Sequence, residues 1–230
     1  MHIEKENSSW SFEGIANDFV IHARRSIPGY DQGHELICKY SDFFCATDKP
    51  IVDIGCSTGL LLGKIAERHE NKTELKFIGI EPVKDMYEFA CDQSEDPRIE
   101  FENNSVENLD LPKSNLIISY YTMQFISPSI RQAIIEKIYD SLDWGGAFLM
   151  FEKVRASDAR FQDYASQIYN EFKIDNEFSE TEIINKSRSI KGVMEPFSSQ
   201  ANIDLLKRAG FEDVQSIFKW VCFEGFLAIK

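Results

Sequence analysis

The feature that most constrains the fold is a short apolar run that ends in a glycine turn, Ile51-Val52-Asp53-Ile54-Gly55-Cys56-Ser57-Thr58-Gly59. Its apolar residues are typical of a buried strand, and its two glycines permit backbone angles and a close ligand approach that a β-carbon would block. From residue 60 to residue 68, apolar side chains recur at helical spacing. A strand, a glycine turn and a helix N-terminus together predict a site where backbone N–H groups face the polar or negative end of a ligand.

A carboxylate follows the next apolar run. Glu81 ends the run 75–81 and lies 26 positions after Gly55, near the spacing at which doubly wound folds place an acid on a ribose diol. The turn is not the dinucleotide fingerprint G-x-G-x-x-G. From Asp53 it reads D-x-G-C-S-x-G, which resembles the first motif of class I methyltransferases that use S-adenosylmethionine (SAM), with Glu81 as the acid of their second motif. This resemblance implies SAM as the cofactor; the alternative is a doubly wound domain whose glycine turn is only a turn.

Apolar strands and amphipathic helices alternate along the chain. We expect strands near 51–55, 75–81, 98–102, 115–120 and 147–151, and helices near 59–70, 84–92 and 128–142. This alternation predicts a parallel sheet with right-handed crossovers and a ligand at the carboxyl ends of its strands. Two last strands, near 214–218 and 221–229, are close enough to pair as an antiparallel hairpin, which resembles the end of the methyltransferase sheet. We therefore expect one α/β domain over 1–230 with a doubly wound, Rossmann-like sheet of seven mostly parallel strands.

Two helical segments are expected to cover the strand ends. Residues 1–50 predict an N-terminal helical cover, with a lead-in helix from Trp10 to Ile21, a break at Pro28 and a second helix over 31–46. Residues 155–195 predict a helical insertion after the fifth strand that serves as a lid or a dimer contact. Its apolar stripe includes Tyr164 and Tyr169 and fits either core packing or a ligand wall.

Candidate pocket residues follow the third and fourth strands. Ser105 and Val106 lie in a polar loop, where a side chain and a backbone N–H could bind an adenine ring; an ordinary loop is the alternative. Tyr120, Tyr121 and Gln124 follow the fourth strand. Aromatic faces attract a sulfonium cation, although aromatic packing alone explains the tyrosines equally well.

The composition of the chain indicates which kinds of ligand and environment are disfavoured. The chain has 25 Lys and Arg against 38 Asp and Glu, a net charge of −13, which disfavours direct nucleic-acid binding. No apolar run has the length of a membrane span, and the charged N-terminus is not a signal peptide, so we expect a cytoplasmic protein. The five Cys include no C-x-x-C pair and the His residues lack ligand spacing, which predicts free thiols and no metal site.

A narrower resemblance extends over nearly the whole chain. The segments 25–30, 53–57, 121–125, 131–146 and 152–153 resemble the carboxy-SAM synthase family. This family forms dimers and converts SAM and prephenate to carboxy-SAM, which is later used to modify the wobble uridine of tRNA. The resemblance implies that SAM is contacted by Tyr30, Gly55, Cys56, Ser57, Glu81, Pro82, Ser105 and Val106.

Two positions depart from that family. Tyr120 stands where the family usually has Asn, and Ser187 stands where it has an Arg that binds the added carboxylate. Arg188 is adjacent, but neighbours on a helix point about 100° apart. Because Ser cannot replace a bidentate guanidinium, these departures question carboxy-SAM synthesis and leave SAM binding intact.

Four hypotheses follow. The first is a SAM-dependent methyltransferase, or a related SAM-using enzyme, that acts on a small molecule; Tyr120, Tyr121 and Gln124 border its pocket and Tyr164 or Tyr169 closes it. The second is carboxy-SAM synthesis, with Arg188 or an Arg from a partner chain replacing the missing one. The third is an attack by SAM's own amine that closes a ring and releases methylthioadenosine. The fourth is a SAM-binding protein without catalysis. No general base is identifiable.

Overall fold

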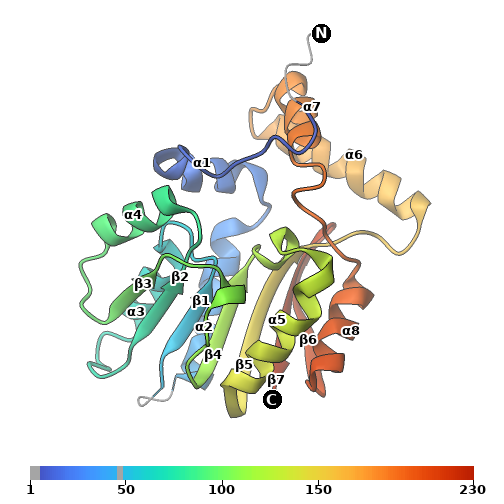
Figure 1. Cartoon of the computed structure of the whole chain (residues 1–230). Helices are drawn as coiled ribbons and strands as arrows, with labels where there is room; N and C mark the ends of the chain where they lie inside the picture. Colours follow the sequence, from blue (N-terminus) through green and yellow to red (C-terminus); the bar gives the residue numbers. More distant parts are fainter. Residues whose placement is uncertain (1–5, 46–48) are drawn as a thin grey trace.

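The computed structural model describes residues 6–45 and 49–230, which form a sheet between helices with further helices above its upper edge (Figure 1). The strands are β1 Ile51–Ile54, β2 Phe77–Ile80, β3 Ile99–Glu102, β4 Ser114–Tyr120, β5 Leu142–Lys153, β6 Asp213–Trp220 and β7 Phe223–Ile229. The helices are α1 Ala16–Ser26, α2 Tyr30–Phe44, α3 Leu60–Arg68, α4 Lys84–Gln93, α5 Pro128–Ser141, α6 Ala159–Asp175, α7 Glu180–Ser189 and α8 Ser199–Ala209, with short 3₁₀ turns η1 Val106–Asn108 and η2 Met123–Phe125.

The seven strands are arranged in the order β3-β2-β1-β4-β5-β7-β6. Strands β1 to β5 run parallel to one another, whereas β7 is antiparallel to both β5 and β6. The expected α/β class, the mostly parallel sheet and the final hairpin are confirmed. Because the strand order reverses between β1 and β4, the crevice for a ligand lies at the carboxyl ends of these two strands.

Both faces of the sheet are buried, which explains the uninterrupted apolar runs of its central strands. Along β4, Leu116 and Ile118 belong to one core, and Ile117 belongs to the other. The first core is completed by α2 and α3 and the second by α5 and α8, through residues such as Ile37, Leu62, Ile135 and Leu206.

The expected lead-in helix is misplaced. Helix α1 begins at Ala16 rather than at Trp10, because Gly14 has φ +76°, which no α-helix accommodates. The break before the second helix is where Pro28 requires it, since Ile27 is extended with φ −115° and ψ 108°.

The fifth strand is longer than expected, and it begins at Leu142 instead of residue 147. Leu142 pairs with Ser114 but Ala147 pairs with Leu116, so extra residues of β5 bulge out beside β4. Gly145 lies in this bulge with φ +80°. Residues 143–146, which follow the predicted helix, therefore belong to an irregular part of β5.

Helices α1, α6 and α7 lie above the carboxyl ends of the parallel strands (Figure 1). We call α1, the residues that precede it and α6–α7 the cover. Residues 1–5 and 46–48 of the expected N-terminal segment lie outside the described residues. In the described part of the chain, no helix has both the length and the apolar character needed to cross a bilayer.

Candidate functional site

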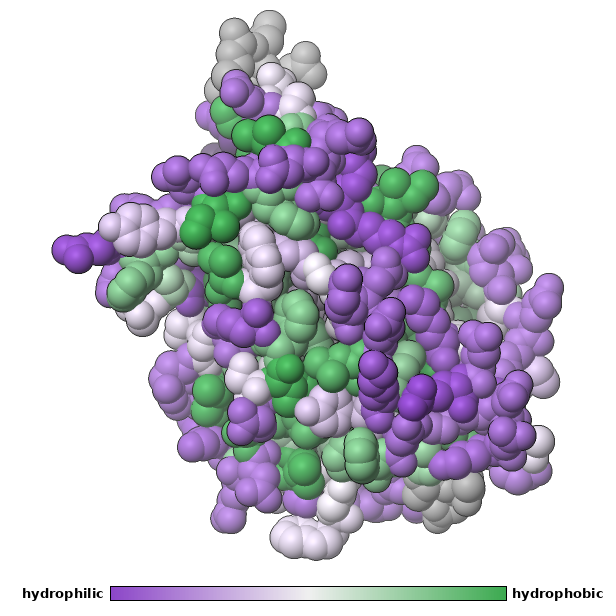
Figure 2. All heavy atoms as spheres, turned by 180° about the vertical axis from the view of Figure 1, so that it is seen from behind, coloured by the Kyte–Doolittle hydropathy of each residue, from purple (hydrophilic) through white to green (hydrophobic). Residues whose placement is uncertain are grey.

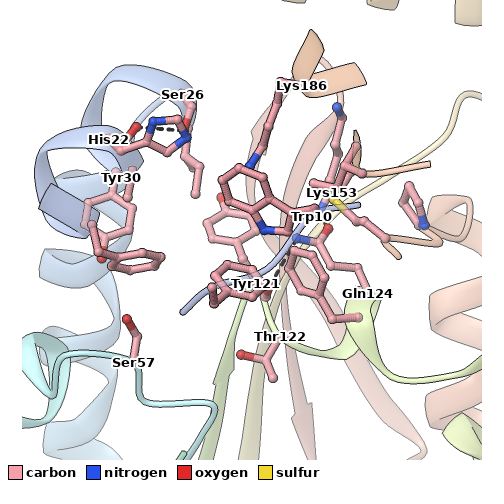
Figure 3. Close-up of a pocket in the computed structure, with 18 of the residues that line it drawn as sticks. Trp10, His22, Ser26, Tyr30, Ser57, Tyr121, Thr122, Gln124, Lys153 and Lys186 are labelled. Atoms are coloured by element: carbon pink, nitrogen blue, oxygen red, sulfur yellow. Dashed lines mark hydrogen bonds between the residues drawn. The ribbon is translucent and has the colours of Figure 1, made fainter. Parts of the chain in front are cut away.

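A cavity of about 1110 Å³ lies between the strand ends and the cover. Figure 3 shows side chains from the N-terminal segment, the glycine turn, the end of β4 and α7 converging on it. Small-molecule sites usually measure roughly 300–1,000 Å³. This cavity therefore has room for a nucleoside cofactor together with a second small molecule.

The floor of the cavity is the turn between β1 and α3. Gly55 and Gly59 have φ +71° and +73° there, and Ser57 has φ +53°. A Cβ on Gly55 would collide with the side chain of Thr122, so glycine is required for space as well as for conformation. The N–H groups of Gly55 and Cys56 both donate to the carbonyl oxygen of Ile80, at 2.7 and 3.1 Å. The turn is thus fixed against the end of β2.

Two buried carboxylates lie beside this turn. The Glu81 carboxylate accepts the N–H groups of Ser57 and Val83, each at 2.8 Å. Burial raises the pKa of Glu81, and these two hydrogen bonds oppose the rise. Burial, with a smaller effect of Glu81, raises the pKa of Asp53 to about 7. Oδ1 of Asp53 has no hydrogen-bond partner among the described residues, as expected of an acceptor that faces a bound ligand.

One wall of the cavity is aromatic. The rings of Tyr30 and His34 have centroids 4.5 Å apart, those of His34 and Tyr120 4.7 Å, and those of Tyr120 and Tyr121 4.6 Å. Oη of Tyr120 donates to the carbonyl oxygen of Tyr30 at 2.6 Å. Burial raises the pKa of Tyr120 and lowers that of His34 to about 3. The wall is therefore neutral, and its faces are suited to a sulfonium.

Both the nitrogen and the oxygen of the Gln124 side-chain amide form hydrogen bonds within the protein. Its Nε2 donates to the Tyr121 carbonyl oxygen at 3.1 Å, and its Oε1 accepts the Lys153 N–H at 3.0 Å. Tyr121 itself has φ +62° and is buried. The geometry makes Gln124 a brace between the ends of β4 and β5.

Most residues named from the sequence meet at this cavity. The lining includes Tyr30, Asp53, Gly55, Cys56, Ser57, Glu81, Pro82, Tyr120, Tyr121, Gln124, Tyr169 and Ser187. Four others do not line it: Ser105 and Val106 at the start of η1, Tyr164, which is exposed on α6, and Arg188 on α7.

Three lysines at the cover end of the cavity were missed by the sequence reasoning. Lys153 ends β5, and its Nζ lies 4.1 Å from the centroid of the Tyr169 ring. Lys173 Nζ lies 4.5 Å from the same centroid. Lys186 reaches down from α7 to the ring of Trp10, with Nζ 2.5 Å from its centroid (Figure 3). Only Lys153 had a possible signal, its place directly after a strand.

Burial lowers the pKa of all three lysines. The pKa of Lys186 falls to about 6 and that of Lys173 to about 8. The neighbouring Lys153 contributes to the lower pKa of Lys173, after burial. The cover end of the cavity is therefore lined by lysines whose charged form is disfavoured by poor hydration.

The two halves of the cover are joined by hydrogen bonds. The Trp10 N–H donates to the Ser189 carbonyl oxygen at 3.1 Å. Tyr169 Oη donates to the Ser26 carbonyl oxygen at 2.9 Å, and Arg25 Nε donates to that of Asn176 at 2.9 Å. The N-terminal segment and the insertion thus form one layer over the cavity.

In the described ranges, no group of His, Cys, Asp and Glu side chains has an arrangement that could hold a metal ion. The observed features fit a nucleoside cofactor instead. The turn has glycine at both ends, so the backbone can be approached closely there. The Glu81 carboxylate with remaining acceptor capacity and the unpartnered Asp53 oxygen match the donors of a ribose and an amino group.

Comparison with known proteins agrees with this geometry. The methyltransferase domain family matches residues 51–146. The chain is 34% identical to the carboxy-S-adenosyl-L-methionine synthase of Campylobacter lari over 94% of this chain and 92% of that protein. It is 34% identical to the enzyme of the same name from Staphylococcus epidermidis over 96% and 97%.

Solved structures share the fold. A possible histamine N-methyltransferase from Thermotoga maritima is similar with a TM-score of 0.62 at 18% identity, over 95% of this chain and 98% of that one. Human N-acetylserotonin methyltransferase in complex with SAM is similar with a TM-score of 0.57 at 16% identity, over 98% and 63%.

Proposed function

The chain belongs to the carboxy-S-adenosyl-L-methionine synthase family, within the SAM-dependent transferases of the class I methyltransferase fold, and we propose that it acts on a small molecule bound beside SAM. The observation that carries this proposal is the single cavity that joins the glycine turn to the lysine-lined end under the cover. When bound, SAM supplies an electrophilic sulfonium with a transferable methyl group.

In this proposal the residues of the chain bind and orient. Glu81 accepts the ribose hydroxyls, the turn at Gly55 to Ser57 admits the amino-acid portion, and the wall of Tyr30 and Tyr120 faces the sulfonium. The cover excludes water, so that most of the rate enhancement comes from proximity and a dry pocket. We assign Ser105 and Val106 to the adenine end, where SAM would extend beyond the cavity.

Carboxy-SAM synthesis is the second candidate, and the full-length similarity to two synthases favours it. Ser187 lines the cavity where the family resemblance implies an Arg, and Arg188 lies outside the lining. Under this candidate another cation must therefore bind the added carboxylate.

Product analysis separates the candidates. The purified protein is incubated with SAM, with and without prephenate, and its nucleoside products are weighed by mass spectrometry. A nucleoside heavier than SAM by one carboxylate supports the synthase and overturns simple methyl transfer. Free methylthioadenosine without an acceptor supports ring closure, and tight SAM binding without any product supports a non-catalytic role.

We further propose a homodimeric, cytoplasmic protein with one SAM-binding domain over 1–230 and no nucleic-acid substrate. Exposed Phe161, Tyr164 and Ile168 share a face of α6, and Figure 2 shows hydrophobic side chains interrupting a largely hydrophilic surface. The free cysteines suit a reducing compartment. Light scattering of the wild type and of Ile168→Lys tests the dimer: a wild-type monomer contradicts it.

A further inference from the structure

The lysines at the cover end of the cavity have no anionic partner among the residues that the structure describes. Within residues 6–45 and 49–230, Lys153, Lys173 and Lys186 contact aromatic rings, and none of their ammonium groups forms an ion pair or a hydrogen bond. Cations are rarely buried without a partner, because burial removes their hydration. Two of them, Lys153 and Lys173, lie against the same ring of Tyr169.

The acidic residues of the cavity do not compensate this charge. The charged lining comprises Lys153, Arg155, Lys173, Lys186 and Lys191 against Asp53, Glu81 and Glu182. Asp53 and Glu81 lie at the glycine turn, the opposite end. The Glu182 carboxylate accepts the N–H and hydroxyl of Ser179 at 2.8 and 2.6 Å. Although the chain has 38 acidic residues, none of those that the structure describes forms an ion pair with these three half-buried lysines.

We propose that Lys153 and Lys173 form the subsite that binds a carboxylate of the second substrate, with the Tyr169 ring as its wall. The proposal rests on the proposed function, because it assigns Lys153 and Lys173 to the part of the same cavity that binds the second substrate. The two ammonium groups come from β5 and α6, so they supply the positive charge that Ser187 on α7 does not. The Phe223 ring, 5.8 Å from Lys153 Nζ, extends the apolar wall for the carbon skeleton of the substrate.

SAM also carries a carboxylate, so the test must distinguish the two sources. Calorimetry first measures the affinity for S-adenosylhomocysteine in the wild type, Lys153→Met and Lys173→Met. Prephenate, phenylpyruvate, succinate and neutral dimethyl succinate are then titrated into each protein saturated with S-adenosylhomocysteine. Lys207→Met, an exposed lysine on α8 outside the cavity, is the matched control.

We expect at least one of the three anions to bind the wild type and the neutral ester not to bind. Each cavity variant should weaken the anion by about tenfold or more, as for loss of a charge-assisted contact, and leave the affinity for S-adenosylhomocysteine unchanged. Lys173→Arg should restore most of the anion affinity. The ligand-free Lys153→Met variant should melt at a higher temperature, since an unpaired buried charge is removed.

Three results overturn the subsite. The first is a loss of S-adenosylhomocysteine affinity in the lysine variants, which would assign these lysines to the cofactor's carboxylate. The second is that none of the anions binds the saturated wild type. The third is an equal anion affinity in all variants. A wild type that does not bind S-adenosylhomocysteine at all overturns the proposed function instead.

Discussion

Substitution of Gly55 should reveal two separate costs, the strain of a left-handed backbone and the collision of a new Cβ with its neighbours. Gly55 and Gly145 both have positive φ, but a Cβ would meet Thr122 at the first and nothing within 4 Å at the second. We expect Gly145→Ala to lower the free energy of unfolding by roughly 1–2 kcal/mol for the left-handed backbone. Gly55→Ala should cost about 1–3 kcal/mol more for overpacking and abolish SAM binding.

Chemical denaturation and calorimetry measure both effects. Adding Thr122→Ala to Gly55→Ala should recover most of the additional loss of stability. Equal costs for the two single glycine variants would show that the contact with Thr122 is unimportant.

Glu81 gives a second prediction at this scale. Glu81→Gln should keep one acceptor for the N–H of Ser57 or Val83 but lose the charge that ribose hydroxyls would meet. We expect the SAM affinity to fall roughly tenfold, in line with loss of a charge-assisted hydrogen bond, and the melting temperature to fall as well, because one of the two N–H groups loses its acceptor. Glu88→Gln on the exposed face of α4 is the control, and equal SAM affinity for both variants would remove Glu81 from the ribose site.

Residues of the candidate site could be predicted from the sequence only where their spacing within one segment is typical of a known motif. Asp53 and Gly55 lie at the carboxyl end of β1, and Glu81 directly follows the adjacent parallel strand β2, so topology alone brings them together. Lys153 and Lys173 come from different elements and meet only through the packing of α6 on the end of β5. The sequence shows no spacing that relates these two lysines, which is why they were missed.

Helix α7 depends on its first turn. Ser179 and Glu182 form a capping box: Ser179 Oγ accepts the Glu182 N–H at 3.2 Å, and the Glu182 carboxylate accepts the Ser179 N–H. Ser179→Ala should destabilise the helix by about 1 kcal/mol. Hydrogen exchange over 180–189 should then accelerate several-fold, and SAM affinity should fall slightly because α7 roofs the cavity.

Ser198→Ala removes an equivalent cap from α8, which does not line this cavity. It should cost a similar free energy without changing SAM affinity. If both variants weaken SAM binding equally, the effect is global rather than a property of the cover.

The positions of helices and strands were predicted well where the hydrophobic periodicity is clear. They were predicted less well where tertiary contacts determine where an element begins. Strands β1 to β4 and helices α3, α4 and α5 begin within two residues of their expected positions. The N-terminal helix is displaced because Trp10 belongs to the cover through its hydrogen bond to Ser189, a contact of high sequence separation. The early start of β5 depends on its pairing with Ser114, which no local pattern reveals.

At the scale of the whole molecule, buried acids link stability to pH. Burial raises the pKa of Glu152 to about 8, from an ordinary 4.5. Between these values the folded chain retains a proton that the unfolded chain has released, so this residue's contribution to stability is lost as pH rises. Lys186 has the opposite effect, because its lowered pKa favours the folded state as pH rises.

Comparison of the wild type with Glu152→Gln measures the contribution of Glu152 to the pH dependence of the free energy of unfolding. We expect Glu152→Gln to match the wild type near pH 4 and to gain in free energy of unfolding as pH rises to 8, by up to about 1.4 kcal/mol per pH unit. Denaturant unfolding at pH 5, 6.5 and 8 measures this, with the exposed Glu212→Gln as control. A constant difference between the wild type and Glu152→Gln at all three values would contradict it.

The hydrogen bonds that join the N-terminal segment to the insertion have a kinetic consequence. Because the Trp10–Ser189, Ser26–Tyr169 and Arg25–Asn176 links connect the two halves directly, neither half can lift without breaking contacts to the other. We therefore expect the two halves to open in one concerted event, so that the same opening sets the residence time of every occupant. Turnover should then depend on how often the cover opens to release product.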